Sequence, residues 1–395
     1  MIRHHAFIEA LAALDEKDPL WMSTLGGFSV LRVVDSIAGR EAEPPLAAAR
    51  KATEAIPQKD PSRGILMRIV DRLEKKPELS SEVGNDLLSY GRVMDVEARW
   101  SVAADIFDTL GEVFQAREHP ELVTDAATAL GSAARNLGDW ERSAKAYATA
   151  QYLADSVRDV ARSLIVEVGI ATTSMMRGNL PAADAVLDEV MAAAEREGLD
   201  SVKAIALHAR ASVAHTRGDY RRAIHFAHQS LELTTNTGAR DRLLADIAAA
   251  YAGLGIFDTA RDGYTIVALT SPHRAVRWQA KLNLMELAIA EGSEARFDEL
   301  RDELDREPLD PRLRAYFLLY SGLGLKRFGR TGADEMLEAA REHAAQHDLH
   351  QIAFEAEGAS RESVAATVAQ PEHEVPTELI DIAQRISGLR QSVTG

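Results

Sequence analysis

Histidine is the residue type whose spacing in this sequence comes closest to that of a chemical site. His343, His347 and His350 follow one another at intervals of four and three residues, so one unbroken helix would carry all three on a single face. His225 and His228 form a second pair. Two imidazoles one helical turn apart can chelate zinc or copper. The segment around His343 lacks the glutamate that metalloproteases hold between their histidines, and solvent-exposed histidines explain the same spacing. We favour solvent-exposed histidines over a metal site and expect neither a metal nor a cofactor.

Other catalytic motifs are missing from the sequence. It contains no Gly-x-Ser-x-Gly elbow and no Walker-type Gly-Lys-Ser/Thr. The glycines between Gly322 and Gly329 imitate a phosphate-binding loop, but their spacing is wrong for one. The absence of cysteine excludes disulfides, thiolate metal sites and cysteine nucleophiles. The sequence therefore predicts a protein that is not an enzyme.

Composition limits the partners. The 395 residues carry a formal net charge of −16, which repels phosphate backbones and anionic lipids, so we expect no nucleic acid and no membrane as a partner. The first residues lack the basic and apolar regions of a secretory signal, and together with the missing cysteine this favours a cytoplasmic protein. Abundant alanine and the scarcity of alternating β-branched runs favour helices over strands.

A glycine recurs at nearly constant intervals through the middle of the chain. The turn glycines are Gly138, Gly178, Gly218, Gly255, Gly292 and Gly329, separated by 40, 40, 37, 37 and 37 residues. One further step of 40 backwards reaches Ala98, which gives seven units in one register. Glycine reaches the left-handed conformation easily, so each one is expected to end a helix and start a tight reversal.

Further positions follow the same register. Two residues after the turn stands a large apolar residue, expected to wedge between the helices: Trp100, Trp140, Leu180, Tyr220 and Phe257. Five residues after it stands a small residue that lets the backbones approach: Ala103, Ser143, Ala183, Ala223 and Ala260. Nine residues after it stand Phe107, Tyr147, Leu187 and Tyr264. The pattern predicts repeated helix–turn–helix pairs.

This pattern resembles the central turn of the tetratricopeptide repeat (TPR) family, in which Gly-Asp-Trp/Tyr is followed by a small residue and an aromatic one. The small residue seven positions before the turn also matches: Gly131, Ala171, Ala211, Ala248 and Gly322. The family's usual unit has about 34 residues, whereas these units have 37 to 40 and resemble the long-unit subclass found in bacterial regulators and scaffold proteins. The resemblance implies an all-α, right-handed α-solenoid of antiparallel helix pairs over residues 80–350.

The two ends depart from the repeat. Residues 1–79 are predicted to form four helices that cap the array, with starts after Asp18-Pro19, Pro44-Pro45 and Asp60-Pro61. In residues 351–395, Pro371 and Pro376 mark a linker before a last helix that begins at Thr377, followed by a frayed tail. The apolar residues Leu379, Ile382 and Ile386 of that helix either cap the array within the chain or pair with a second copy, so the oligomeric state stays open.

The resemblance also implies a ligand groove, because the first helix of each pair lines the concave side of such an array. Carried over by position, the groove residues are Asp125, Thr128, Ser132, Arg135, Asn136, Thr172, His208, Ser212, His215 and Arg242. Further along, Ala245, Ala249, Leu282 and Leu319 are expected to make the groove apolar. The arginines would pair with a carboxylate or phosphate, and Asn136 would bond a peptide backbone. The alternative is that these are ordinary solvated residues.

The leading functional prediction is a non-enzymatic scaffold or adaptor that binds a protein or peptide in the groove. The alternative is a ligand- or peptide-responsive regulator similar to bacterial peptide-pheromone receptors. Most such regulators carry a helix-turn-helix domain, but residues 1–79 lack the basic recognition helix that DNA binding requires.

Overall fold

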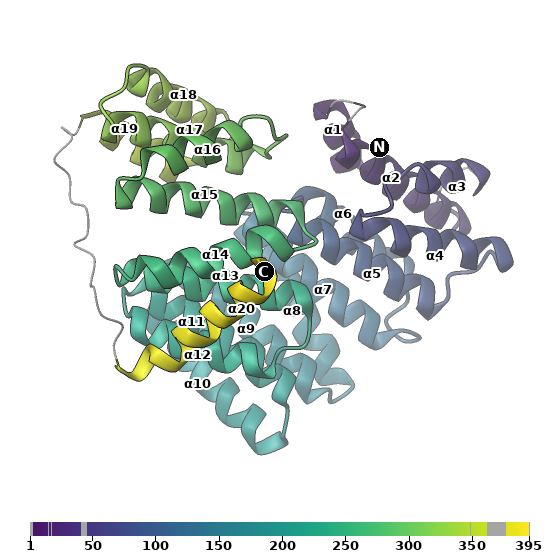
Figure 1. Ribbon diagram of the computed structural model, residues 1–395. Coiled ribbons are helices and arrows are strands. Elements are labelled where there is room, and N and C mark those ends of the chain that lie inside the picture. The colour runs from purple at the N-terminus through teal and green to yellow at the C-terminus, as the bar shows by residue number, and fades with distance from the viewer. Residues whose placement is uncertain are drawn as a thin grey trace. The chain divides into compact units, whose positions relative to one another are not determined.

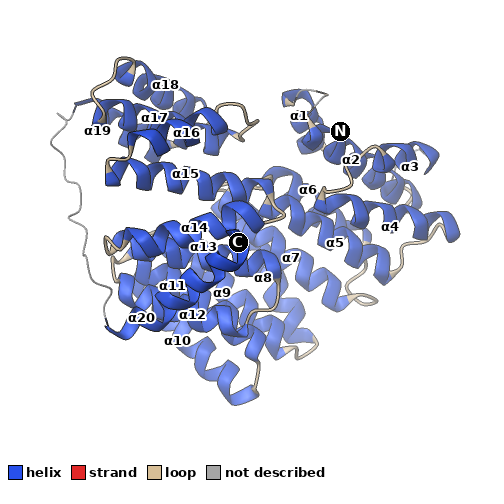
Figure 2. Ribbon diagram, viewed as in Figure 1, coloured by secondary structure: helices blue, strands red, loops and turns tan. Residues whose placement is uncertain are grey.

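The chain is helical throughout the part that the computed structural model describes, which comprises residues 3–14, 16, 18–40, 46–347, 349–361 and 377–394. Helices account for 82% of the residues, and the described residues contain no strand (Figure 2). The chain divides into two compact units, residues 1–209 and 210–395, with the boundary inside α11 (Asp200–Thr216). The all-α class predicted from the sequence is confirmed.

Among the described residues of the first unit, ten helices precede α11 (Figure 1). They are α1 (His5–Ala13), α2 (Pro19–Ile37), α3 (Leu46–Glu54), α4 (Pro61–Lys75), α5 (Ser81–Val96), α6 (Trp100–Val113), α7 (Pro120–Asn136), α8 (Trp140–Ser156), α9 (Val160–Met176) and α10 (Leu180–Glu197). From α1 to α10 each helix packs on its neighbour in sequence, and α7 also lies beside α5 and α9. This is the contact pattern of stacked helix pairs.

The second unit continues the pattern after α11. Its elements are α12 (Tyr220–Leu233), α13 (Thr237–Gly253), α14 (Phe257–Thr270), α15 (Arg274–Glu291), α16 (Glu294–Leu304), α17 (Pro311–Arg327), α18 (Ala333–Gln346), α19 (His350–Arg361), the 3-10 turn η1 (Thr377–Leu379) and α20 (Ile380–Thr394). Consecutive helices from α12 to α19 again pack on each other, and α15 contacts both α13 and α17.

The repeat register is visible in the backbone. The six turn glycines all have positive φ, from 66° at Gly329 to 82° at Gly178. Ala98, which stands at the seventh position of the series, adopts φ 57° although it is not glycine. Each of these residues comes between two helices of a pair, as the spacing predicted. The seven residues of the predicted register thus share one backbone conformation at the turns.

Tyr147 shows how the small residues position the helices. A Cβ built on Gly131 of α7 would lie 2.8 Å from the Tyr147 ring, and one on Gly169 of α9 would lie 2.5 Å from it. The ring therefore occupies space that only glycine leaves open on both neighbouring helices. The small residues five positions after each turn are likewise buried. The large apolar residues two positions after the turn were expected to wedge between the helices. Trp140 does so only in part, because it begins its helix with 36% of its surface exposed.

The four helices predicted for the N-terminal region are present as α1 to α4. Asp18 and Asp60 cap α2 and α4, each accepting a hydrogen bond from the backbone N–H two residues on, and Pro19 and Pro61 occupy the first helical turn. A proline there loses no helical hydrogen bond, because the first N–H groups of a helix have no partner within it. Two of the three expected starts, Asp18-Pro19 and Asp60-Pro61, therefore begin helices, whereas Pro44-Pro45 lies outside the described residues.

The C-terminal helix packs back onto its own unit. Figure 1 shows α20 in yellow against α14, and η1 contacts α12. Leu379, Ile382 and Ile386 are buried in the same core as Tyr251, whose hydroxyl donates a hydrogen bond to the Leu379 carbonyl at 3.0 Å. These apolar residues therefore cap the helices of their own chain, which is the first of the two alternatives left open by the sequence. The last helix is longer than expected and reaches Thr394, whereas the predicted linker prolines lie outside the described residues.

Within the described residues we find no helix with the length and apolar composition that a bilayer crossing requires.

Candidate functional site

The predicted groove residues of α7 are largely engaged with neighbouring helices. Arg162 of α9 holds Asp125, with Nε 2.8 Å from Oδ1, and also pairs with Asp159. Arg135 donates to the Tyr147 hydroxyl at 3.0 Å and to the Ser132 hydroxyl at 2.9 Å, and a longer contact of 3.4 Å reaches the Gly169 carbonyl. The structure thus brings Ser132 and Arg135 together, but in bonds that tie α7 to α8 and α9.

The remaining predicted residues make local contacts or face solvent. The hydroxyls of Thr128 and Thr172 bond carbonyls one turn earlier in their own helices, as side chains of this type often do. His215 is exposed, with its ring edge against Tyr220 at 5.2 Å between centroids. The half-buried members of this set are Asn136, His208 and Ser212, whereas Arg242 is exposed. These residues stay predicted ligand contacts.

One part of the predicted groove is wrong. Leu282 and Leu319 have 0% and 1% of their surface exposed and belong to the hydrophobic core, so they do not make the groove apolar. They stand ten residues before a turn glycine, and this position faces inward in α15 and α17. The neighbouring positions, nine and thirteen residues before the turn, face outward instead.

Those outward positions carry polar and aromatic side chains that the sequence interpretation missed. On α15 they are Gln279 and Asn283, whose side-chain amides bond each other at 2.9 Å. On α17 they are Tyr316 and Tyr320, whose rings stack with centroids 5.8 Å apart. One turn beyond Asn283, Glu286 accepts a hydrogen bond from the Tyr320 hydroxyl at 3.1 Å. We call Glu286, Tyr316 and Tyr320 the tyrosine–glutamate site.

Glu286 has an unusual electrostatic environment. Burial among atoms of the neighbouring helices raises the pKa of its carboxyl, and the negative charge of Glu355 on α19 adds to that shift against the hydrogen bond from Tyr320. The side chain nevertheless remains exposed to solvent. The carboxyl group thus lies close to protein atoms and remains accessible to solvent. Burial also raises the pKa of the Tyr320 hydroxyl far above its usual value, so this hydroxyl stays protonated.

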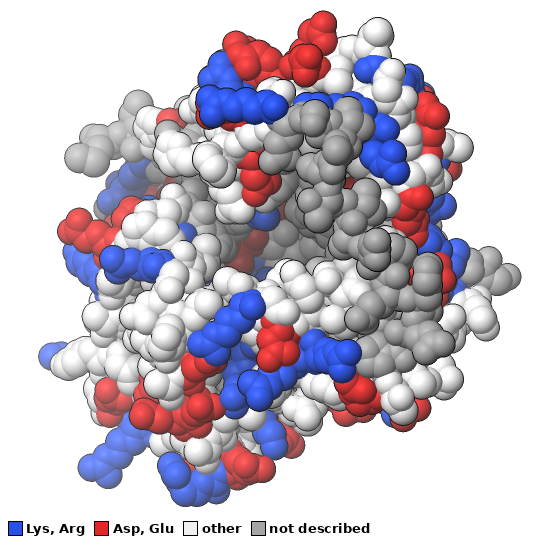
Figure 3. Space-filling view, turned by 90° about the vertical axis from the view of Figure 1, so that its left-hand side faces the viewer, with Lys and Arg blue, Asp and Glu red and all other residues white. Residues whose placement is uncertain are grey.

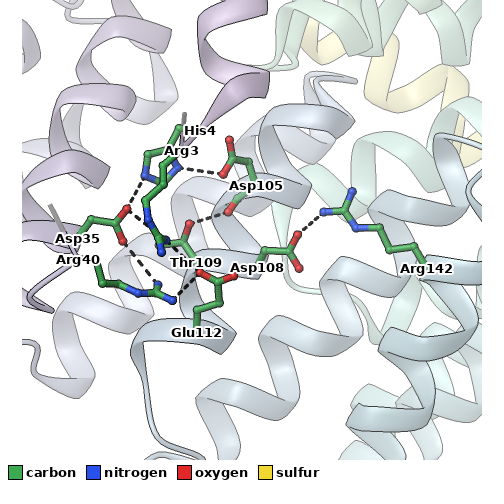
Figure 4. A network of polar contacts seen from close by, with 9 residues as sticks. All are labelled: Arg3, His4, Asp35, Arg40, Asp105, Asp108, Thr109, Glu112 and Arg142. Atoms are coloured by element: carbon green, nitrogen blue, oxygen red, sulfur yellow. Dashed lines mark hydrogen bonds and ion pairs between the residues drawn. The ribbon is translucent and has the colours of Figure 1, made fainter. Parts of the chain in front are cut away.

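A second charged cluster lies in the first unit around His4 (Figure 4). The His4 ring has only 2% exposure, with Nε2 3.0 Å from Asp35 Oδ2 and Nδ1 2.9 Å from Asp105 Oδ1. Arg3 and Arg40 flank Asp35 at 3.7 and 3.6 Å. We call these residues, together with Glu112, which pairs with both arginines, the His4 network. It connects the N-terminal segment and α2 to α6.

The contacts of His4 identify its charge state. Burial alone would lower the pKa of His4, but the hydrogen bonds and charges of Asp105 and Asp35 outweigh it and raise the pKa to about 9. The histidine is therefore an imidazolium with a carboxylate on each nitrogen. Phe7 and Phe28 enclose the ring edge-on at 6.2 and 6.3 Å. A charged, enclosed and doubly paired histidine suits a structural role better than proton transfer to a substrate.

The histidines that opened the sequence argument do not share one helix. The helix α18 ends at Gln346 and α19 begins at His350, so the predicted stripe is interrupted. His343 and His347 do lie together, with ring centroids 4.7 Å apart, and His343 Nε2 is 3.0 Å from the Pro311 carbonyl. Over the described ranges, no three His, Asp or Glu side chains form a group that could hold a metal ion.

No protein-family model matches this chain, and a comparison with curated proteins found no significant similarity. A functional conclusion therefore depends on the residues and their contacts.

Proposed function

We propose that this chain is a TPR-like, non-enzymatic scaffold or adaptor that binds a protein or peptide segment along the face formed by the first helices of its pairs. A right-handed superhelix and a cytoplasmic location are part of this proposal. The seven-unit register and the packing of consecutive helix pairs within each unit support the relation to the TPR family.

The observation that carries the proposal is the tyrosine–glutamate site on α15 and α17. These are first helices of neighbouring pairs and they contact each other. Their outward side chains combine partly exposed aromatic rings with a solvent-accessible carboxylate that Tyr320 bonds. Aromatic side chains with an apolar body and a polar end are favoured at protein interfaces. The amide pair Gln279–Asn283 beside them offers hydrogen bonds to a peptide backbone.

Charge distribution supports a specific contact over general electrostatic adhesion. Lys and Arg side chains are interspersed with Asp and Glu over the face in Figure 3, although the chain as a whole carries −16. Once a segment has reached this face, selectivity depends on local arrangements such as the tyrosine–glutamate site, because the mixed charge there does not favour one position over another.

A peptide-display selection on the full chain tests the proposal. Peptides enriched on the wild type are measured on a double variant, Arg242→Ala with Tyr320→Leu, which alters two first helices. The control is Tyr152→Ala, which removes an aromatic residue that is 74% exposed on the second helix α8. We expect the double variant to lose at least about tenfold in affinity, or 1.4 kcal/mol, and the control to bind as the wild type does. Equal binding to all three proteins would contradict the proposal.

A further inference from the structure

The Glu286 carboxylate has a surrounding that leaves its negative charge uncompensated within the described part of the chain. The groups that act on it there are Tyr320, which donates a neutral hydrogen bond, and Glu355, which repels it. A carboxylate that is even partly removed from water is normally paired, because desolvating a charge without a partner costs free energy. Here Glu355 adds the charge of a second carboxylate, and no cation among the described residues pairs with Glu286.

Glu355 sharpens this imbalance. It comes from α19, and its one described hydrogen bond is from the Gln351 side-chain amide at 3.0 Å, which is neutral. The site thus gathers negative charge from two helices, and that arrangement repels any anionic group. An incoming cation would be attracted by both carboxylates at once.

The stacked tyrosines also attract cations, as the two carboxylates do. The face of an aromatic ring carries negative electrostatic potential and attracts ammonium and guanidinium groups. Arg312 of α17 already uses this property, because its guanidinium carbon lies 5.8 Å from the centroid of the Tyr316 ring. The Tyr320 ring stands next to Tyr316 and beside Glu286, so a cation near it would meet a ring and a carboxylate together.

We propose that the tyrosine–glutamate site binds the ammonium or guanidinium group of a lysine or arginine side chain in the bound peptide segment. The inference rests on the proposed function and adds the chemistry of the partner. The net charge of −16 favours the approach of a basic segment, and the local site then selects one basic side chain of it.

The ligand chemistry can be tested without knowing the natural partner. The probes are acetyl-Ala-Ala-Lys-Ala-Ala-amide, its arginine version and its norleucine version, which has an uncharged side chain of similar length. Each is titrated into the full chain, labelled with ¹³C on its eight tyrosines, in about 0.15 M salt, where attraction between exposed charges is screened beyond about 8 Å. We expect the lysine and arginine peptides to shift the ring signals of Tyr316 and Tyr320, and the norleucine peptide to leave them unchanged.

Variants separate the site from general attraction to an acidic protein. Glu286→Gln keeps the shape and removes the charge, and it should weaken the lysine peptide about tenfold. Glu299→Gln, at an exposed position of α16, removes one unit of the same charge and should change nothing. Tyr320→Phe keeps the ring and removes the hydroxyl, so it should retain binding within about threefold and shows that the α17 face remains folded. Thermal melts of all variants exclude unfolding as a cause.

Two results would overturn the inference. One is equal binding of the lysine and norleucine peptides, and the other is an equal effect of Glu286→Gln and Glu299→Gln. Spermidine tests whether the site binds a free polyamine instead. If spermidine shifts the ring signals and neither basic peptide does, the ligand is not a peptide side chain. The display selection is a separate criterion. Neutral peptides that depend on the α15 and α17 face would sustain the proposed function while refuting the basic side chain.

Discussion

The His4 network and the tyrosine–glutamate site both hold an ionisable group whose pKa is raised, yet the two shifts mean opposite things. For His4 the raised pKa belongs to a cation that two carboxylates stabilise. For Glu286 it belongs to an acid whose charged form is disfavoured by burial and by Glu355. The same direction of shift therefore marks a satisfied charge in one unit and an unsatisfied charge in the other.

The difference separates a structural cluster from a binding site. His4 and Asp35 at the centre of the His4 network are enclosed, and the carboxylates and cations of the network come from three segments that they hold together. The tyrosine–glutamate site is accessible, and its charge has no such partner within the described residues. Natural folds tolerate locally unfavourable electrostatics mainly where a function requires it. Substitutions can therefore test whether a charge with partners stabilises the fold and a charge without partners does not.

Removing the histidine gives the largest expected effect. His4→Ala leaves Asp35, which has no exposed surface, and Asp105 without the cation between them. Breaking a buried ion pair from one side costs about 3 to 5 kcal/mol of unfolding free energy. The measurement is urea denaturation, with hydrogen exchange of α2 and α6 to locate the loss.

His5→Ala is the matched control. His5 is the next residue, but its side chain is 69% exposed and pairs with Glu9 on the surface at 3.2 Å. An exposed pair of this kind contributes less than about 1 kcal/mol. If His5→Ala and His4→Ala destabilise the protein equally, the His4 network is not a satisfied structural cluster and the comparison fails.

The pH dependence of wild-type stability comes next in size. The folded-state pKa of His4 is about 9 and its ordinary value is 6.5. Because the folded pKa is raised, the contribution is fully present below pH 6.5 and is lost as the pH rises through 9. A shift of this size corresponds to about 3 kcal/mol. Urea midpoints at pH 6, 8 and 10 check it. His4→Gln should remove the fall, and a fall that persists in this variant would assign it to another group.

The fold was predictable because repeated packing leaves a repeated mark on the sequence. Each turn needs a left-handed residue and each close helix approach needs a small one, so Gly138 and Gly131 recur with their equivalents in other units. The His4 network leaves no such mark. His4 and Asp105 are separated by 101 residues, and their contact depends on how α1 packs against α6.

The candidate site was missed for a different reason. Arg242 was selected at thirteen residues before a turn glycine, and the same position in the next two units holds Gln279 and Tyr316. The sequence interpretation followed the position ten residues before the turn, where Leu282 and Leu319 proved to be buried. In α15 and α17 a change of one position exchanges an outward residue for an inward one. A helix boundary read from sequence is not accurate enough to make that choice.

Arg40→Ala measures how far the His4 network shares its charges. Arg40 lies 3.6 Å from Asp35 and 2.7 Å from Glu112, and its side chain is 22% exposed. Asp35 would keep His4 and Arg3, so we expect a loss of only about 1 kcal/mol in unfolding free energy by urea denaturation. A loss as large as that of His4→Ala would mean that the arginine, and not the histidine, compensates the buried carboxylate.

Glu286→Gln has the smallest expected effect on the free protein and the opposite sign. The folded-state pKa of Glu286 is raised, so the folded protein disfavours the ionised carboxylate. The ionised side chain therefore lowers the free energy of unfolding, and this loss grows as the pH rises through the folded pKa. The amide removes the charge while it can still accept the hydrogen bond from Tyr320. Since the side chain is exposed, solvent screening limits the gain to less than about 1 kcal/mol at pH 7. Urea denaturation at pH 4 and pH 7 should show the gain only at the higher pH. A loss of stability at pH 7 would reveal that Glu286 is a satisfied charge like His4, and the contrast between the two regions would disappear.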